Sequence, residues 1–280
     1  MRVAIRSFTE DDIAFALVQT SREGWDATSE LFELLLAHDP HACFIAEHEG
    51  QRVGMVTTTT YRNTAWIGNL IVPPQYRGCG VGSRIMTHAM KHLSQQGIRT
   101  IRLEADPPGI KLYRRLGFVE EFESLRFRHE RPTSISKRSA DRLVETDLPE
   151  VAVFDARYFG DDRRRLLGMF FEYARTAYQV RAGGALRAYA MALPCAFGVR
   201  IGPWVAQDRD AAHAVLQSVL TDVQGKTVCL GVLSVNREAV ELLASLGFER
   251  TPSSFRMVHG EACGCGEPER IFAIGGGAMG

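Results

Sequence analysis

The sequence predicts two tandem domains of the α/β (α+β) class, each with a central sheet flanked by helices. The chain has 280 residues, of which 45% are hydrophobic and 24% charged, and this length suits two domains of about 100–150 residues each. In both halves short alternating strands are mixed with stretches of helical periodicity. The pattern Leu-x-x-x-Leu-Gly-Phe occurs at 112–118 and again at 242–248, and Ile-Gly occurs at 67–68 and 201–202. The two halves are therefore predicted to be copies of one fold.

The first domain is expected over residues 1–130. Phe32, Leu35 and Leu36 have helical spacing, and a long apolar stripe from Ile85 to Leu93 predicts one amphipathic helix. Alternation of apolar and polar residues around His48-Glu49-Gly50-Gln51 predicts a β-hairpin. The expected elements are helices at 11–22 and 28–38, strands at 43–47, 53–58 and 64–72, a helix ending at Gly97, a strand at 98–105 and a helix at 109–116.

Residues 131–138, rich in polar and breaker residues, predict a linker, and the second domain is expected over 139–280. The end of the chain, 275–280, contains Gly-x-Gly-x-x-Gly after a strand-like stretch at 270–274. No helix follows to give that motif its dinucleotide-binding meaning, so a flexible glycine-rich tail is expected. The expected elements of this domain are helices at 147–157 and 161–174, strands at 176–182, 185–193 and 197–205, a helix at 208–223, a strand at 227–233 and a helix at 236–246.

The charge balance argues against several classes of partner. Basic and acidic residues are equal at 33 each, so the long-range field of a nucleic-acid or membrane-surface binder is not expected. No apolar run approaches the roughly 18 residues that span a bilayer, and the start lacks the apolar core of a signal peptide. We therefore expect a cytoplasmic protein, a monomer or homodimer, without nucleic acid or membrane partners.

The cysteines do not predict a disulfide framework or a metal site. Six are scattered along the chain, four of them in apolar or strand-like stretches where reduced thiols act as small hydrophobes. Cys263 and Cys265 have metal-like spacing, but no second Cys or His pair of the usual kind accompanies them. No bound metal is expected.

The chemistry-bearing segment is a glycine loop at the start of a helix. The strand ending at Val72 runs into a loop with Gly78, Gly80 and Gly82, and this loop opens the amphipathic helix. Glycines let backbone N–H groups converge, and the helix N-terminus adds partial positive charge, so the site suits a phosphate or pyrophosphate. Ser83 breaks the dinucleotide pattern, and no Gly-Lys-Ser/Thr follows, which disfavours NAD and nucleoside triphosphates.

Gln75, Gly78 and Gly80 form Q-x-x-G-x-G, and here the sequence resembles the GNAT acetyltransferases, whose corresponding loop binds the pyrophosphate of acetyl-coenzyme A. The resemblance covers most of residues 2–128 and includes the L-Y-x-x-x-G-F signature at 112–118. It implies two GNAT-like folds in tandem, each with a mixed, mostly antiparallel sheet, and acetyl-CoA as co-substrate. The residues expected to bind acetyl-CoA are Leu70, Ile71, Val72, Gln75, Arg77, Gly78, Cys79, Gly80, Val81, Gly82, Ser83 and Tyr113.

The resemblance also implies an N-acetyltransferase in which an amine attacks the thioester directly in a ternary complex. The strand at 64–72 would polarise the carbonyl with an N–H near Leu70, Ile71 or Val72, provided that it splays from its neighbour. Tyr113 matches the family's tyrosine and is the expected general acid. Glu104 is the first choice for the base, with Asp26 or water as alternatives.

Two positions depart from the family pattern, and the acceptor is left open. Asp106 and Gly109 stand where many similar enzymes have Asn and Ala, which could reshape the acyl pocket. Trp25 and Asp26 lie where GNAT proteins build the acceptor site, and Trp25 could equally be a core residue that holds the helices together. An amino acid, a polyamine, a drug-like amine, a peptide N-terminus or a lysine all fit as acceptor.

The second copy is expected to have lost the chemistry. The stretch 204–212 has no glycine and carries Asp208 and Asp210 where a pyrophosphate would lie, and Leu243 replaces the tyrosine. One coenzyme A per chain is therefore expected. The charged stretch 161–165 could face an acidic substrate group or form a solvated helix end. The alternative to an enzyme is a non-catalytic acyl-CoA sensor or interaction protein.

Overall fold

The structure is a computed structural model that describes residues 1–132, 138–261 and 266–280. The chain forms two compact units. The first consists of Met1–Glu120, a stretch that begins at Met257, and Ala278–Gly280; the second consists of Glu121–Arg256 and a stretch that ends at Gly277. Residues 133–137 of the expected linker and the pair Cys263 and Cys265 lie outside the described residues.

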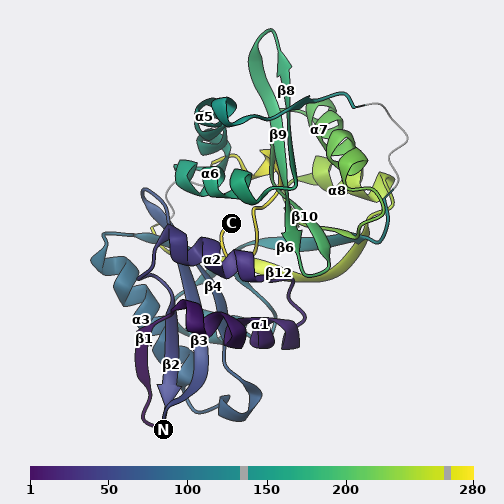
Figure 1. Ribbon diagram of the computed structural model, residues 1–280. Helices are drawn as coiled ribbons and strands as arrows, with labels where there is room; N and C mark the ends of the chain where they lie inside the picture. Colours follow the sequence, from purple (N-terminus) through teal and green to yellow (C-terminus); the bar gives the residue numbers. More distant parts are fainter. Residues whose placement is uncertain (133–137, 262–265) are drawn as a thin grey trace. The chain divides into compact units, whose positions relative to one another are not determined.

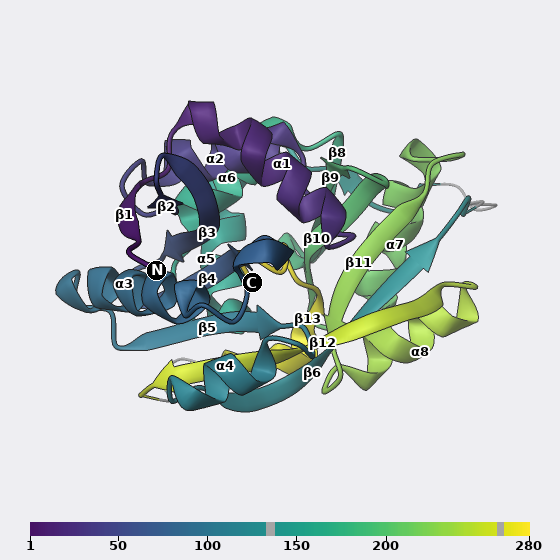
Figure 2. The same ribbon diagram turned by 90° about the horizontal axis from the view of Figure 1, so that it is seen from below.

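The first unit contains a mixed, mostly antiparallel sheet with helices on both faces, as the sequence predicts. Its strands follow the order β1-β2-β3-β4-β5, and β4–β5 is the parallel pair in this order. Helices α1 and α2 lie on one face and α3 on the other (Figure 2). The elements are β1 (Ala4–Ser7), α1 (Ile13–Arg22), α2 (Ser29–His38), β2 (Phe44–His48), β3 (Gln51–Thr60), β4 (Thr64–Ile71), α3 (Val81–Gln95), β5 (Thr100–Ala105) and α4 (Ile110–Arg115).

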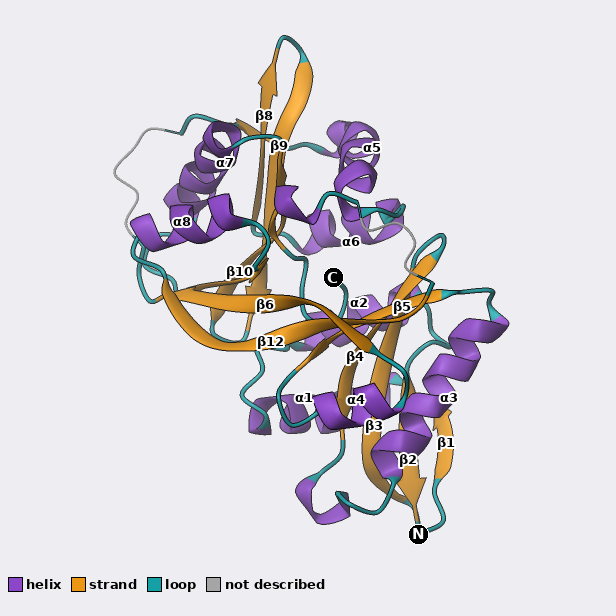
Figure 3. Ribbon diagram, turned by 180° about the vertical axis from the view of Figure 1, so that it is seen from behind, coloured by secondary structure: helices purple, strands orange, loops and turns teal. Residues whose placement is uncertain are grey.

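The second unit repeats this arrangement. Strand β10 is antiparallel to β9 and parallel to β11, and helices α5 and α6 lie on the opposite side of the β8–β9 hairpin from α7 and α8 (Figure 3). Tyr178, Trp204 and Val215 are fully buried in its core. The elements are β7 (Asp141–Arg142), α5 (Leu148–Phe159), α6 (Arg164–Tyr173), β8 (Thr176–Ala182), β9 (Ala185–Cys195), β10 (Gly198–Ala206), α7 (Arg209–Asp222), β11 (Val228–Leu233), α8 (Arg237–Ser245) and β13 (Ile271–Ala273).

The two repeats exchange their last long strands. Strand β6 (Val119–His129) follows the first repeat in sequence but pairs with β11 of the second, and the end of β12 (Glu249–Gly260) belongs to the first unit. The packing is reciprocal: His259 contacts the ring of Phe118 in the first unit, and His129 contacts Phe248 in the second. The compact units therefore do not coincide with the two repeats as they run along the chain (Figure 1).

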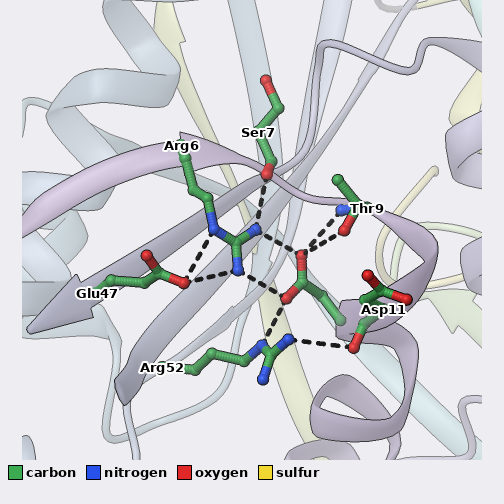
Figure 4. Close-up of polar contacts among 7 residues, drawn as sticks. Arg6, Ser7, Thr9, Asp11, Glu47 and Arg52 are labelled. Carbon is green, nitrogen blue, oxygen red and sulfur yellow. Dashed lines mark hydrogen bonds and ion pairs between the residues drawn. The ribbon is translucent and has the colours of Figure 1, made fainter. Parts of the chain in front are cut away.

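A buried carboxylate ties β1, β3 and the start of α1 together (Figure 4). Asp12 is fully buried and accepts hydrogen bonds from Arg6 (2.6 and 2.9 Å), Arg52 (2.5 Å) and the backbone N–H of Thr9 (2.9 Å). Burial alone would raise the pKa of Asp12, but the hydrogen bonds from the two arginines outweigh it and hold that pKa well below its usual range. The cluster therefore stabilises the entry of the chain into the first unit.

The glycine-rich end of the chain is packed against the first unit, where the sequence predicts a flexible tail. Ala278 and Met279 are only 9% and 1% exposed, and the hydroxyl of Tyr61 donates to the carbonyl of Met279. The missing helix was a sound argument against a dinucleotide site, but it carried no information about packing. Apolar side chains placed between the glycines provide the buried surface that orders the segment.

The structure also bears on disulfide bonds and on membrane-spanning helices. Among the described residues, Cys43, Cys79, Cys195 and Cys229 form no disulfide bond. Along the described stretches, no helix is both long and apolar enough to cross a bilayer.

Candidate active site

Strand β4 carries a bulge near its end. On β3, Met55 lies opposite Ile71 and Thr57 lies opposite Gly68, so a single β3 residue faces both Asn69 and Leu70. Asn69 adopts a positive φ of 49°, and its amide donates to the hydroxyl of Thr57 at 3.0 Å. The bulge re-aims the backbone at the position where the sequence analysis expects a carbonyl-polarising N–H group.

Strands β4 and β5 pair only over their first four residues. The ladder runs from Thr64 opposite Thr100 to Ile67 opposite Leu103, and no described strand pairs with β4 on this side beyond it. Glu104 is the first β5 residue past the paired part and is half-buried. The separation of β4 from its neighbour, which the mechanism requires, is thus present, and Glu104 lies where it begins.

The glycine loop is exposed and leads directly into α3. Gly78 and Gly80 both have φ of +79°, and a Cβ at either would meet nothing within 4 Å. The first helical bond runs from the N–H of Arg84 to the carbonyl of Gly80 (3.1 Å), so the N–H groups before it have no intrahelical partner. Those N–H groups and the positive end of the helix dipole fit an anion such as the diphosphate of coenzyme A.

The remaining residues expected at the cofactor differ in exposure. Arg77 donates to the carbonyl of Val72 (2.8 Å) and pairs with Glu23, so it connects the glycine loop to the α1–α2 loop. Arg84 donates to the carbonyl of Met1 (2.7 Å). Gln75 and Cys79 are exposed, Leu70, Val72, Gly82 and Ser83 are half-buried, and Ile71 and Val81 are buried.

Tyr113 is buried on α4, with 8% of its surface exposed. Burial raises the pKa of its hydroxyl, and the nearby carboxylate of Asp106 raises it further, so the phenol stays protonated at neutral pH. A Cβ at Gly109 would lie 2.8 Å from the ring carbon Cε2 of Tyr113. The departure from Ala to Gly at position 109 therefore makes room for the tyrosine ring.

The loop between α1 and α2 is tied to the site at two points. The indole N–H of Trp25 donates to Oδ2 of Asp106 at 3.0 Å, and Glu23 pairs with Arg77. Asp26 is half-buried in the same loop. The family resemblance leads us to expect Trp25 and Asp26 near the acceptor. It does not predict the bond between Trp25 and Asp106, because no local pattern links residues 81 positions apart.

Comparison with known proteins decides the family. The sequence profile described as "Acetyltransferase (GNAT) family" matches residues 8–118, and that described as "Acetyltransferase (GNAT) domain" matches residues 151–273. The chain belongs to the GNAT acetyltransferase family. Its two GNAT domains stand in tandem, as the sequence predicts.

Relatives and solved structures extend over most of the chain. Holothin acyltransferase of Pseudoalteromonas sp. (strain SANK 73390) is 24% identical over 261 residues, which cover 90% of this chain and 86% of that protein. A crystal structure of a Pyrococcus horikoshii protein, provisionally assigned as an acetyltransferase, is 25% identical and superposes with a TM-score of 0.84 over 99% of this chain and 96% of that one. A tandem GNAT protein from the clavulanic acid biosynthesis pathway shares the fold, with a TM-score of 0.65, 17% identity, and coverage of 92% and 98%.

The second GNAT domain keeps the bulge but caps the helix. In β10, Gly202 and Pro203 together face one residue of β9. Asp208 caps α7: its carboxylate accepts the N–H of Ala211 (2.9 Å) and a bond from Arg187 (2.7 Å). These contacts, the bond from Ala211 first, lower the pKa of Asp208. A carboxylate of the protein thus occupies the helix start that the first GNAT domain leaves open.

In the first domain β4 and β5 separate beyond their paired residues, and we call this opening the split. In the second domain the corresponding split, between β10 and β11, is filled by β13. Strand β10 pairs with β11 only at Val199 and Arg200, and further along it pairs with β13. On the other side the N–H of Ile274 donates to Gly231 of β11 at 2.9 Å. Asn236 caps α8 by accepting the N–H of Ala239 and also donates to the carbonyl of Ile271 at 3.0 Å. The chain itself therefore occupies this split.

Two arginines of the charged stretch 161–165 form ion pairs with carboxylates of the same unit. Arg163 is fully buried and donates two hydrogen bonds to Asp155 (2.8 and 2.9 Å), while Arg164 pairs with Asp162. Across the ranges that the structure describes, no cluster of three or more His, Cys, Asp and Glu side chains is arranged to hold a metal ion.

Proposed function

We propose that this GNAT protein transfers an acetyl group from acetyl-CoA to a primary amine in its first domain. The observation that carries the proposal is the open glycine loop at the start of α3, directly after the bulged end of β4. In the same unit a buried, protonated tyrosine lies on α4. These are the parts that an acyl transfer from a thioester requires.

The loop would hold the diphosphate of acetyl-CoA mainly through backbone N–H groups. Gly78 and Gly80 keep the space above the loop free of side chains, and the unpaired N–H groups at the start of α3 face a ligand there. Gln75, Arg77, Cys79 and the residues 81–83 surround this cradle. The cofactor supplies an activated acyl group as a thioester.

The chain's own residues then perform three tasks. An N–H at Leu70, Ile71 or Val72, beyond the part of β4 that pairs with β5, stabilises the charge that develops on the carbonyl oxygen. Tyr113 donates its proton to the departing thiolate. Glu104, at the opening between β4 and β5, takes a proton from the amine directly or through water, and Asp26 is the alternative base.

The acceptor would enter beside the loop that carries Trp25 and Asp26. A small-molecule amine, a peptide N-terminus or a lysine side chain each presents the primary amine that the reaction needs. The indole N–H of Trp25 donates to Asp106, whose carboxylate lies near Tyr113. This bond fixes an aromatic surface close to the proposed general acid, Tyr113. We propose that the protein works in the cytoplasm, where acetyl-CoA is made and consumed.

The test is release of thiol from acetyl-CoA in the presence of a library of primary amines, followed by mass spectrometry of the acceptors. Thiol release with a matching gain of one acetyl group by an amine is the expected result. Binding of coenzyme A without transfer to any amine would instead identify a non-catalytic acyl-CoA binder. Absence of coenzyme A binding would contradict the proposed function altogether.

A further inference from the structure

Residues 278–280 pack on one particular face of β4. Phe44 packs against α3, and Val56 is its partner across β2 and β3. Because side chains alternate along a strand, Thr57 and its partner Gly68 point to the opposite face. This is the face covered by α1 and α2 (Figure 2).

The contacts of this segment leave no free space beneath it. A Cβ on Gly68 would lie 2.4 Å from the Cβ of Ala278, and a Cβ on Gly280 would lie 2.8 Å from the ring of Trp66. Tyr61 donates its hydroxyl to the carbonyl of Met279. The segment is therefore seated on β4 by both close packing and a buried hydrogen bond.

Residues 278–280 lie on β4 next to the residues that would bind the acyl carbonyl in the proposed function. Gly68 immediately precedes the bulge residues Asn69 and Leu70, whose backbone would face the acyl carbonyl. An amine that approaches this carbonyl across the face of α1 meets Ala278 next to Gly68. We infer that residues 278–280 form one wall of the acceptor site and limit the size of the amine that can react.

Comparison with the second unit indicates that residues 278–280 line the acceptor site and do not block the cofactor site. Gly202, the counterpart of Gly68, would place a Cβ 2.0 Å from the carbonyl of Ile274, so the same stretch of chain passes close to both bulges. In the second unit this stretch enters the ladder as β13 and fills the split beside β10. In the first unit residues 278–280 lie on the face of β4 at Trp66 and Gly68, outside any described strand pairing. The split itself is left to the cofactor.

The inference rests on the proposed function and is tested with two amines that share one reactive end. The full chain and a variant lacking residues 278–280 are assayed with propylamine and 3-phenylpropylamine, and coenzyme A affinity is measured for both proteins. We expect the ratio of kcat/KM for the bulky amine to that for the small one to rise roughly 10-fold or more, the range that one pocket contact can give. Coenzyme A affinity should stay the same.

A milder pair of variants covers the case in which the shortened chain does not fold. Tyr61→Phe removes the hydroxyl that holds Met279, and Tyr178→Phe removes a buried hydroxyl that donates to Asp222 in the second unit. Tyr61→Phe should shift the amine ratio in the same direction, by a smaller factor, and Tyr178→Phe should not.

The acceptor wall and the proposed acetyltransferase function fail on different results. An unchanged amine ratio, or an equal gain or loss with both amines, would overturn the acceptor wall while leaving the acetyltransferase intact. Turnover of neither amine by either protein, together with no coenzyme A binding, would contradict the proposed function, and the wall would fall with it.

Discussion

The two GNAT domains begin their central helices in different ways. Helix α3 starts at Gly80, behind an exposed loop, and the N–H groups before Arg84 have no intrahelical partner. Helix α7 starts at Asp208, whose carboxylate accepts the N–H of Ala211. The start of α7 thus carries an anion of the chain itself, whereas the start of α3 does not, and on the proposed function α3 serves an external anion instead.

The two domains also differ at the split beside the central strand, which the chain fills in the second domain and leaves open in the first. Beyond Ile67 the edge of β4 has no partner among the described strands, whereas the corresponding edge of β10 pairs with β13. Both strands keep a bulge, so the fold survives in both domains. The two domains therefore differ in whether the chain itself occupies the helix start and the strand edge, and on the proposed function this difference decides which domain binds coenzyme A.

The largest expected effect comes from blocking the open helix start. Gly80→Glu adds bulk and negative charge where the diphosphate would lie, and coenzyme A affinity should fall by a factor of roughly 100 or more. Gly97→Glu is the matched control, because Gly97 also has a positive φ (+82°) and nothing within 4 Å of its Cβ position. Calorimetry on both variants makes the comparison, and equal loss in the two would indicate backbone strain instead of a lost site.

Tyr113→Phe separates chemistry from binding in the first domain. If its hydroxyl protonates the thiolate, kcat should fall roughly 10- to 1,000-fold while coenzyme A affinity is retained. Leu243, the counterpart of Tyr113, gives the second domain no such group. Leu243→Tyr should still add no activity, because β13 and the Asp208 cap continue to occupy the positions where the cofactor would bind. Steady-state thiol release measures both, and a Tyr113→Phe enzyme as fast as the wild type would reduce this tyrosine to a packing role.

A third difference concerns stability. Asp12 and Asp147 accept the same kind of N–H bond, from Thr9 and Val144 respectively, but Asp12 is fully buried between two arginines and Asp147 is partly exposed. Asp12→Ala should lower the free energy of unfolding by about 2–3 kcal/mol, because it removes the buried carboxylate that accepts hydrogen bonds from Arg6, Arg52 and the N–H of Thr9. Asp147→Ala should cost about 1 kcal/mol, the loss of a cap.

The pH dependence of unfolding checks the sign of this difference. The folded pKa of Asp12 is depressed, so its contribution is present above the unfolded value of about 4 and is lost as the pH falls through the folded pKa. Urea unfolding should show the gap between wild type and Asp12→Ala narrowing from pH 7 to pH 3. A gap that is constant over this range would mean that Asp12 acts through packing and not through charge.

The smallest expected effect tests whether the Asp208 cap or strand β13 keeps coenzyme A out of the second domain. Asp208→Ala removes the cap of α7 and should lower the free energy of unfolding by about 1 kcal/mol. It should not create a second coenzyme A site, because β13 still fills the split between β10 and β11. A new site in this variant would show that the carboxylate alone excludes the cofactor.

The sequence predicts the parts of this structure that local patterns encode. The hairpin, the amphipathic helix after the glycine loop and the repeat at 112–118 and 242–248 follow from periodicity and matching residues, and they appear where expected. The bond from Asn236 to the carbonyl of Ile271 is not predicted from sequence. The two residues lie 35 positions apart, and no local rule connects them.

What the sequence did not predict depends on long-range pairing. The exchange of β6 and β12 sets strands against the other repeat, and two strands of similar apolar pattern carry no label for their partners. The run 270–274 was recognised as strand-like, but its place in the split was not. The packing of residues 278–280 was missed because glycine content was used as a sign of flexibility.

The central claim is that one domain binds coenzyme A and the other is closed by its own chain. Isothermal titration of the full-length protein with coenzyme A tests it most directly. A ratio near one coenzyme A per chain, abolished by Gly80→Glu, is the result that the account predicts. A ratio near two, or a ratio near one that survives Gly80→Glu, would contradict it.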